Sequence, residues 1–226
     1  MHDIVERNLP IGSVLPTEAE MFESYGVGRA SVREALRLLE VNGLITIKTG
    51  PKGGPIVAQA SSVEFAKTAT LFFHSTRATF GELVEARIVM EPVMAALAAR
   101  RRSPETEQAL YESLDLTRRA IEEGDEKLYL AQASSFHGII AGLSGNRVLD
   151  FFGGALKHIY YERVWEALTG QARRPQVLGA HEAVTTAIVA GDADLAEQLM
   201  AEHMNEINDQ LAEHLPRVAD ELIDWR

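Results

Sequence analysis

The pattern of hydrophobic and polar positions predicts two short helices near the start of the chain. Thr17 and Glu20 have the spacing of a capping box, so the first helix is expected to begin there. It is expected to end near Gly26, because glycine suits the left-handed position that follows a helix. A second helix is predicted from 29 to 41, and its apolar residues recur at helical spacing: Val32, Ala35, Leu36 and Leu39.

The residues after this second helix alternate in polarity, as a strand does. Residues 44–49 set Ile45 and Ile47 against polar neighbours. A turn rich in glycine follows over 50–54, and residues 55–58 can return as a second strand. This order of helix, tight turn, helix and hairpin predicts a winged helix-turn-helix.

Beyond residue 60 the pattern changes to helical throughout. The small polar residues 59–62 indicate a junction, so we expect one domain over 1–60 and a second over 61–226. No later segment alternates for long, and breakers separate seven predicted helices: 62–74, 80–101, 104–123, 125–144, 147–169, 173–190 and 192–214. Short connections favour an antiparallel bundle. The predicted fold is therefore mainly α, with an α+β winged head followed by an all-α antiparallel helical bundle.

The second helix also carries a row of arginines away from its apolar stripe. Arg29, Arg33 and Arg37 are spaced four apart, with Ser31 near them. A helix fits the major groove of DNA, where arginine forks read guanine edges or hold phosphates. Lys52 adds a charge at the tip of the glycine-rich turn. An arginine row alone is equally typical of a solvated helix, but with the caps and the hairpin it predicts DNA binding.

The net charge of −11 weighs against a nucleic-acid partner until its distribution is considered. Residues 1–60 hold six Lys/Arg and seven Asp/Glu, so most of the acidity lies outside the predicted head. DNA binding should then depend on docking geometry more than on a broad basic field. The absence of cysteine, of a signal segment and of a long apolar run predicts a cytoplasmic protein without a membrane segment.

Three histidines fall in apolar stripes on three different predicted helices. His137, His181 and His203 should each point inward. One such histidine is most often a core residue, but several buried imidazoles need hydrogen-bond partners or a shared cation. Imidazole nitrogens suit a divalent metal such as Zn or Ni, and an incomplete shell leaves room for an added ligand. A metal site and a purely structural core are both open interpretations.

Arg87 and Glu91 form an i, i+4 pair on the helix predicted over 80–101. The pair is interpreted either as a structural salt bridge or as a site where Arg87 faces a cavity and binds the carboxylate of an effector.

The segment PIGSVLPTEAEMFESYGVGRASVREALRLLEVNGLI resembles the DNA-binding head of GntR-family transcription regulators. In that family the helix equivalent to 29–41 enters the major groove, and the tip of the wing touches the minor groove. The resemblance implies DNA contacts from the second helix and the wing: Arg29, Ser31, Arg33, Lys52 and Gly53. Gly28 and Ala30 depart from the family pattern, which often has hydroxyl residues at those positions.

The rest of the chain resembles the FCD-type ligand-binding domain of the FadR subfamily. The similar segments are RIVMEPVMAALAARR, FHGIIAGLSGN and HEAVTTAIVAGDADLAEQLMAEHM. Metal-binding members use an aspartate one turn before the first of three histidines. His137, His181 and His203 match the histidines, but Ala133 stands at the aspartate position. The resemblance thus implies a weaker site for Zn or Ni, whose shell an effector carboxylate completes.

Together these observations predict a transcription regulator that responds to a ligand and is not an enzyme. The resemblance implies a homodimer on a pseudo-palindromic double-stranded DNA operator, switched by a small organic acid; family members are mostly repressors. The rival is a metal-dependent enzyme with a three-histidine centre. Against it, the sequence reveals no inward Glu or Asp beside the histidines that resembles a general base. A third interpretation is a nucleoid or scaffolding protein without an effector.

Overall fold

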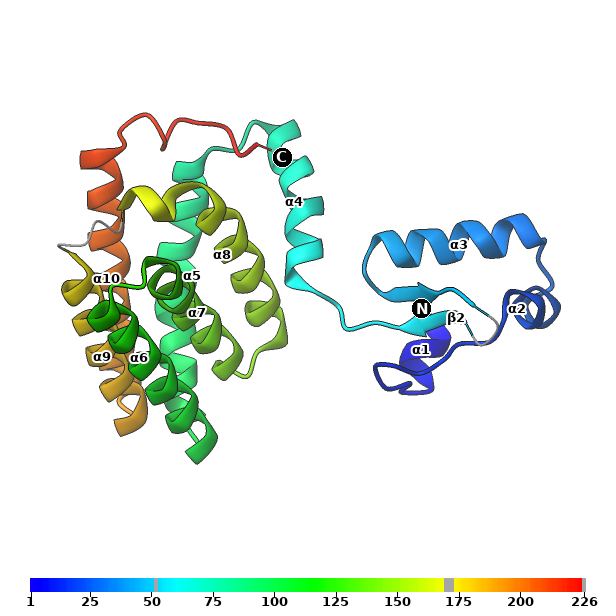
Figure 1. Cartoon of the computed structure of the whole chain (residues 1–226), viewed down its shortest axis with the longest axis horizontal. Coiled ribbons are helices and arrows are strands. Elements are labelled where there is room, and N and C mark those ends of the chain that lie inside the picture. The colour runs from blue at the N-terminus through cyan, green and yellow to red at the C-terminus, as the bar shows by residue number, and fades with distance from the viewer. Residues whose placement is uncertain (51–52, 169–172, 225–226) are drawn as a thin grey trace. The chain divides into compact units, whose positions relative to one another are not determined.

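The chain forms two compact units. The computed structural model describes residues 1–50, 53–168 and 173–224 (Figure 1). The first unit, which we call the head, comprises Met1–Phe65, and the second, the helical unit, comprises Ala66–Arg226. The division falls inside a helix, Ser62–Thr76. The mainly α fold predicted from the sequence is confirmed.

The head contains three helices and one hairpin in the predicted order. Their bounds are α1 His2–Glu6, α2 Glu18–Tyr25, α3 Arg29–Val41, β1 Ile45–Lys48 and β2 Gly54–Val57. The capping box at the start of α2 is present, since the Thr17 N–H donates to Glu20 at 2.7 Å and the Glu20 N–H donates to Thr17 at 3.3 Å. Gly26 ends α2 with φ of 63°, a left-handed conformation. The pattern predicted no helix at α1.

The two strands pair antiparallel, with Ile45 opposite Val57 and Lys48 opposite Gly54. Ile45 is fully buried, whereas Ile47 is 43% exposed, so only one of the two alternating isoleucines enters the core. Gly53 lies in the turn of the wing. A Cβ at this position would lie 2.2 Å from the carbonyl oxygen of Lys48, which is too close for any other residue. The wing therefore depends on glycine at that position.

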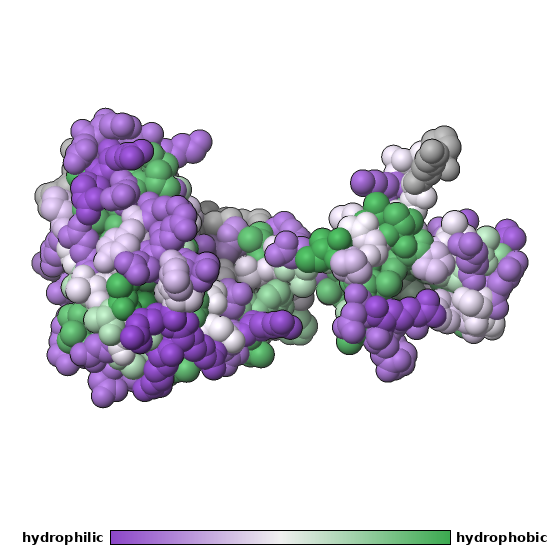
Figure 2. Space-filling view, turned by 90° about the horizontal axis from the view of Figure 1, so that it is seen from below, coloured by the Kyte–Doolittle hydropathy of each residue, from purple (hydrophilic) through white to green (hydrophobic). Residues whose placement is uncertain are grey.

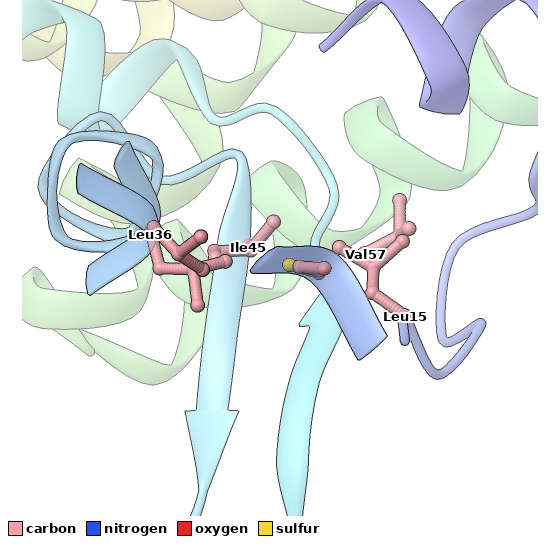
Figure 3. Close-up of a cluster of buried hydrophobic side chains, with 6 residues drawn as sticks. Leu15, Leu36, Ile45 and Val57 are labelled. Carbon is pink, nitrogen blue, oxygen red and sulfur yellow. The ribbon is translucent and has the colours of Figure 1, made fainter. Parts of the chain in front are cut away.

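The core of the head joins α2 and α3 to the sheet. It consists of Leu15, Met21, Val32, Leu36, Ile45 and Val57 (Figure 3). The predicted apolar stripe of α3 is confirmed at Val32 and Leu36, while Ala35 is exposed. Burial of this stripe fixes the roll of α3 and leaves its arginine row in solvent.

The helical unit is built from α4 to α10. Their bounds are α4 Ser62–Thr76, α5 Phe80–Arg100, α6 Pro104–Glu123, α7 Glu126–Leu143, α8 Arg147–Leu168, α9 Arg174–Ala190 and α10 Ala193–His214. Each lies within two residues of its prediction. Helix α5 packs against α7, α8, α9 and α10 and is the central helix of the unit (Figure 1). In the described part of this unit the only extended pairing is the isolated bridge between Thr79 and Leu222.

The surface of the helical unit is mostly hydrophilic on the face drawn in Figure 2, with hydrophobic residues in small groups. This agrees with the excess of acidic residues beyond the head. None of the helices that the structure describes is long and apolar enough to cross a membrane.

Candidate functional site

The first candidate site is the exposed face of α3. Arg29, Ser31 and Arg33 all lie on it in solvent. The guanidinium of Arg29 lies 4.9 Å from the centre of the Phe22 ring on α2, and Nε of Arg33 donates to Glu18 on α2 at 2.8 Å. Both contacts orient the arginines with side chains of the preceding helix. Gly53 stands at the turn of the wing, and Lys52 lies outside the described residues.

The N-terminus of α3 favours anions. Gly28 is its N-cap and offers no side chain to accept from the first turn, which also contains no acidic residue. The free N–H groups and the positive end of the helix dipole are thus combined with Arg29 at one place. A phosphate group would satisfy both.

The second candidate site is a histidine centre inside the helical unit. His137 on α7, His181 on α9 and His203 on α10 are all buried, and one ring nitrogen of each lies within 4.8 Å of the others. The Nε2 atoms of His181 and His203 are 3.1 Å apart. The ring of His181 stacks on Phe136 with centroids 3.9 Å apart. The predicted convergence of three imidazoles from three helices is therefore confirmed.

The surroundings of His181 and His203 favour the neutral forms of these two imidazoles. Burial, together with the neighbouring histidines, lowers the pKa of His181 well below its ordinary value. Burial and the nearby His137 lower the pKa of His203 to about 3. Neutral imidazoles keep a lone pair for a ligand or a cation.

A buried carboxylate lies beside the histidines, and no pattern in the sequence had indicated it there. Glu91 on α5 contacts Nδ1 of His137 with Oε2, while Nε of Arg87 donates to its Oε1 at 2.7 Å. Burial alone would raise the pKa of Glu91, but Arg87 and His137 outweigh it and lower the pKa to about 2. Sequence patterns did not place Glu91 beside the histidines, because i, i+4 spacing does not reveal which side of a helix is buried.

The Arg87–Glu91 pair is both buried and incompletely bonded. Nη1 of Arg87 has no hydrogen-bond partner among the described residues, although its guanidinium lies 4.2 Å from the centre of the Tyr160 ring. Lys157 on the same helix as Tyr160 adds a further cation, whose pKa is lowered by burial and by the charge of Arg87. The Arg87–Glu91 salt bridge expected from the sequence is present, and Nη1 of Arg87 remains as a donor for a ligand. No sequence motif indicated Lys157 or Tyr160, because only packing brings α8 to the histidine centre.

The donor set fits a divalent cation. The Nδ1–H of His137 can donate to Glu91, and its Nε2 has no partner in the described part of the chain. Metal–nitrogen bonds of about 2.0–2.1 Å give nitrogen separations near the 3.1 Å between His181 and His203. Ala133 lies one turn before His137 and is fully buried, and its methyl side chain has no donor atom to serve as a fourth ligand. Three imidazoles with open positions would leave room for an oxygen ligand.

Two families account for most of the chain. The family of bacterial regulatory proteins named gntR matches residues 1–51, and the FCD domain matches residues 82–206. The galactonate operon transcriptional repressor of Escherichia coli is 30% identical over 197 residues, which cover 83% of this chain and 82% of that protein. The HTH-type transcriptional repressor NanR of an Enterobacter species is 25% identical over 207 residues, which cover 87% of this chain and 76% of that repressor.

The fold agrees with these matches. The structure of Streptococcus agalactiae GntR has a TM-score of 0.74 and 25% sequence identity, over 92% of this chain and 94% of that one. These relatives are named as transcription regulators, and none of them supports the enzyme interpretation. The chain belongs to the GntR family of transcription regulators, in the FadR-like branch that joins a winged helix-turn-helix head to an FCD domain.

Proposed function

We propose that this regulator is a cytoplasmic repressor that binds a pseudo-palindromic operator as a dimer and is released by a small organic acid. The observation that carries the proposal is the buried histidine centre with Arg87 and Lys157 near it, in a chain whose head exposes an arginine row. An anionic ligand at such a centre would be held by charge and by unfilled donors at once. The repressor names of the relatives from Escherichia coli and Enterobacter support the direction of control.

DNA recognition is assigned to α3 and the wing. Inserted into the major groove, α3 would present Arg29, Ser31 and Arg33, while Lys52 and Gly53 on the wing approach the neighbouring backbone. Arg33 would exchange Glu18 for DNA, and this exchange costs little because both partners are exposed and surface ion pairs contribute little to stability. Gly53 permits close approach because it has no side chain.

The effector site is assigned to the histidine centre and Arg87. His137, His181 and His203 would hold one divalent cation, such as Zn or Ni, and the cation would supply a Lewis-acid charge for a carboxylate. Because its protein ligands are neutral, that charge is not cancelled, although Glu91 partly offsets it from behind His137. The free Nη1 of Arg87 offers the carboxylate a charge-assisted hydrogen bond.

An apolar surface on the helical unit supports the dimer. Four exposed hydrophobic residues lie on α5 and α8: Val89, Val93, Val148 and Phe152. The two helices run antiparallel, since Arg87 contacts Tyr160 and Gly153 lies against the Met94 side chain. We infer that a second copy would cover these exposed residues of the two neighbouring helices. A two-fold pair of heads suits an operator with two half-sites.

The proposal is tested by operator release. Genomic fragments that bind the purified protein are selected, and the affinity of one is measured by fluorescence anisotropy with a panel of organic acids, with and without chelator. We expect one class of acid to weaken DNA binding and chelator to reduce that effect. Sedimentation of the protein should give the mass of a dimer. Sequence-specific binding that no acid alters would favour the scaffolding interpretation instead.

A further inference from the structure

A second buried guanidinium lies along the seam that holds the histidines. Arg174, at the start of α9, is 3% exposed, and its guanidinium carbon is 4.9 Å from the centre of the Tyr129 ring on α7. Arg174 precedes His181 by seven residues, and Tyr129 precedes His137 by eight, so each pair shares one face of its helix. The Tyr129–Arg174 contact is therefore a second step on the α7–α9 seam. It lies two helical turns from the first step, which His137 and His181 form.

The polar groups at this step are only half bonded. Nη2 of Arg174 donates to Oε1 of Glu126 at 3.1 Å, but Nε of Arg174 and the hydroxyl of Tyr129 have no hydrogen-bond partner among the described residues. Buried groups of this kind normally have one. Nε and Nη2 form the edge with which arginine holds a carboxylate through two parallel bonds, and Glu126 uses one of them. Burial raises the pKa of Tyr129 to about 12, so its hydroxyl remains a donor.

Glu126 is suited to leave this position. Its side chain is 67% exposed, and an ion pair with so much solvent contributes little to stability. Within the described residues, helix α9 also begins without a side-chain cap and without an acidic residue in its first turn. An acid that engages the whole edge of Arg174 can therefore displace Glu126.

Ala133 occupies α7 midway between Tyr129 and His137, on the same face. In metal-binding members of the family an aspartate is expected there. Alanine at this position leaves no carboxylate on α7 between Tyr129 and His137.

We propose that Arg174 and Tyr129 bind the second acid group of a dicarboxylate effector, whose first carboxylate lies at the histidine centre. Glu126 takes the place of that second group when the effector is absent. The inference rests on the proposed function and specifies its ligand class. Seven residues of α9 span about 10 Å. The arginine side chain covers part of this separation, and the remainder fits a diacid of roughly four to six carbons.

The test compares each diacid with a monoacid of the same length. Succinate, glutarate and adipate are titrated calorimetrically into the full chain beside butyrate, pentanoate and hexanoate. We expect one diacid to bind about tenfold more tightly than its monoacid, and Arg174→Gln to remove this difference. Arg174→Lys should restore only part of it, because lysine lacks the forked edge. Glu126→Gln should tighten the diacid several-fold and leave the monoacid unchanged.

Glu123→Gln is the matched control, since it removes one exposed carboxylate close in sequence that is not paired with Arg174. An equal gain in Glu123→Gln, or no diacid advantage in either the native chain or Glu126→Gln, overturns the second anchor. Should the arginine variants fail to fold, the comparison of Glu126→Gln with Glu123→Gln decides alone. Monoacid binding without a diacid advantage rejects only this inference, whereas failure of every acid to bind or to release DNA rejects the proposed function as well.

Discussion

Oε2 of Glu91 on α5 contacts Nδ1 of His137 on α7, and this contact decides which nitrogen of the histidine faces the other two. A carboxylate accepts the Nδ1 proton of a neutral imidazole and leaves the Nε2 lone pair directed at the centre. Arg87 holds the same carboxylate from its other oxygen at 2.7 Å. The orientation of the histidine centre is thus set by a residue that would not itself bind the cation.

Replacing Glu91 with glutamine should weaken metal binding by about 10–100-fold, because an amide no longer fixes the tautomer of His137 or adds negative charge behind it. The affinity for Zn is measured by competition with a chromophoric chelator. Glu85→Gln, which removes an exposed carboxylate from the same helix, should have no effect. Unchanged affinity in the folded Glu91→Gln protein would contradict the role assigned to this contact.

Ala133→Asp should tighten metal binding, since it restores a carboxylate one turn before His137. Without metal the same variant should be less stable than the native chain, because position 133 is fully buried and a charge there has no partner. The melting temperature is measured with chelator and with added Zn, and the two changes should have opposite signs. A variant that loses stability under both conditions would show that the side chain does not reach the centre.

The metal-free protein should lose stability as the pH falls from 7 to 5. The folded-state pKa of His203 is lowered to about 3 by burial and by His137, and that of His181 is lowered as well, while an unfolded histidine titrates near 6.5. Between these values the unfolded chain binds protons that the folded chain does not. Each such histidine therefore removes up to about 1.4 kcal/mol per pH unit below 6.5.

Urea unfolding in chelator at pH 7, 6 and 5 checks this slope. His203→Gln should reduce it, whereas His2→Gln should leave it unchanged, because His2 is exposed at the start of the chain. An equal slope in both variants would mean that other groups control the pH dependence.

The helices could be predicted because their ends are specified by local chemistry. Gly124 and Gly191 end α6 and α9 in left-handed conformations, and Asp125 and Asp192 cap the helices that follow. The convergence of the histidines could also be predicted, since each imidazole shares a face with apolar neighbours that must enter the core. The short helix α1 was missed because no side chain caps it.

The role of Glu91 could not be predicted, for a physical reason. Helix α5 is packed by four other helices, so its apolar residues surround it and no stripe reveals which face holds a polar pair. Spacing shows that Arg87 and Glu91 meet, but only the tertiary arrangement shows that they meet beside His137. Lys157 and Arg174 are brought to the seam in the same way.

Gly28→Ser should stabilise the head by a few tenths of a kcal/mol. Gly28 is the N-cap of α3 with extended backbone at φ of −71°, and a Cβ there meets nothing within 4 Å, so serine fits and can accept from the first turn. Chemical denaturation followed by a probe in the head measures the gain, and Gly28→Ala, which cannot cap, is the control. An equal gain from alanine would assign the effect to the unfolded chain.

Arg33 and Glu18 provide the sharpest test of DNA recognition. Arg33→Ala should weaken binding to a selected operator by about 1–3 kcal/mol if the arginine reads a guanine, and less on unrelated DNA. Glu18→Gln should strengthen operator binding, because it releases Arg33 from the 2.8 Å pair and removes a negative charge near the DNA. Glu23→Gln, which removes another exposed carboxylate of α2, reports the effect of charge alone.

A double-mutant cycle separates the two causes. If Glu18 acts through Arg33, its gain should fall to that of Glu23→Gln once Arg33 is alanine. A gain that persists undiminished in the Arg33→Ala background would assign Glu18 to general electrostatics and leave Arg29 as the arginine of α3 to test next.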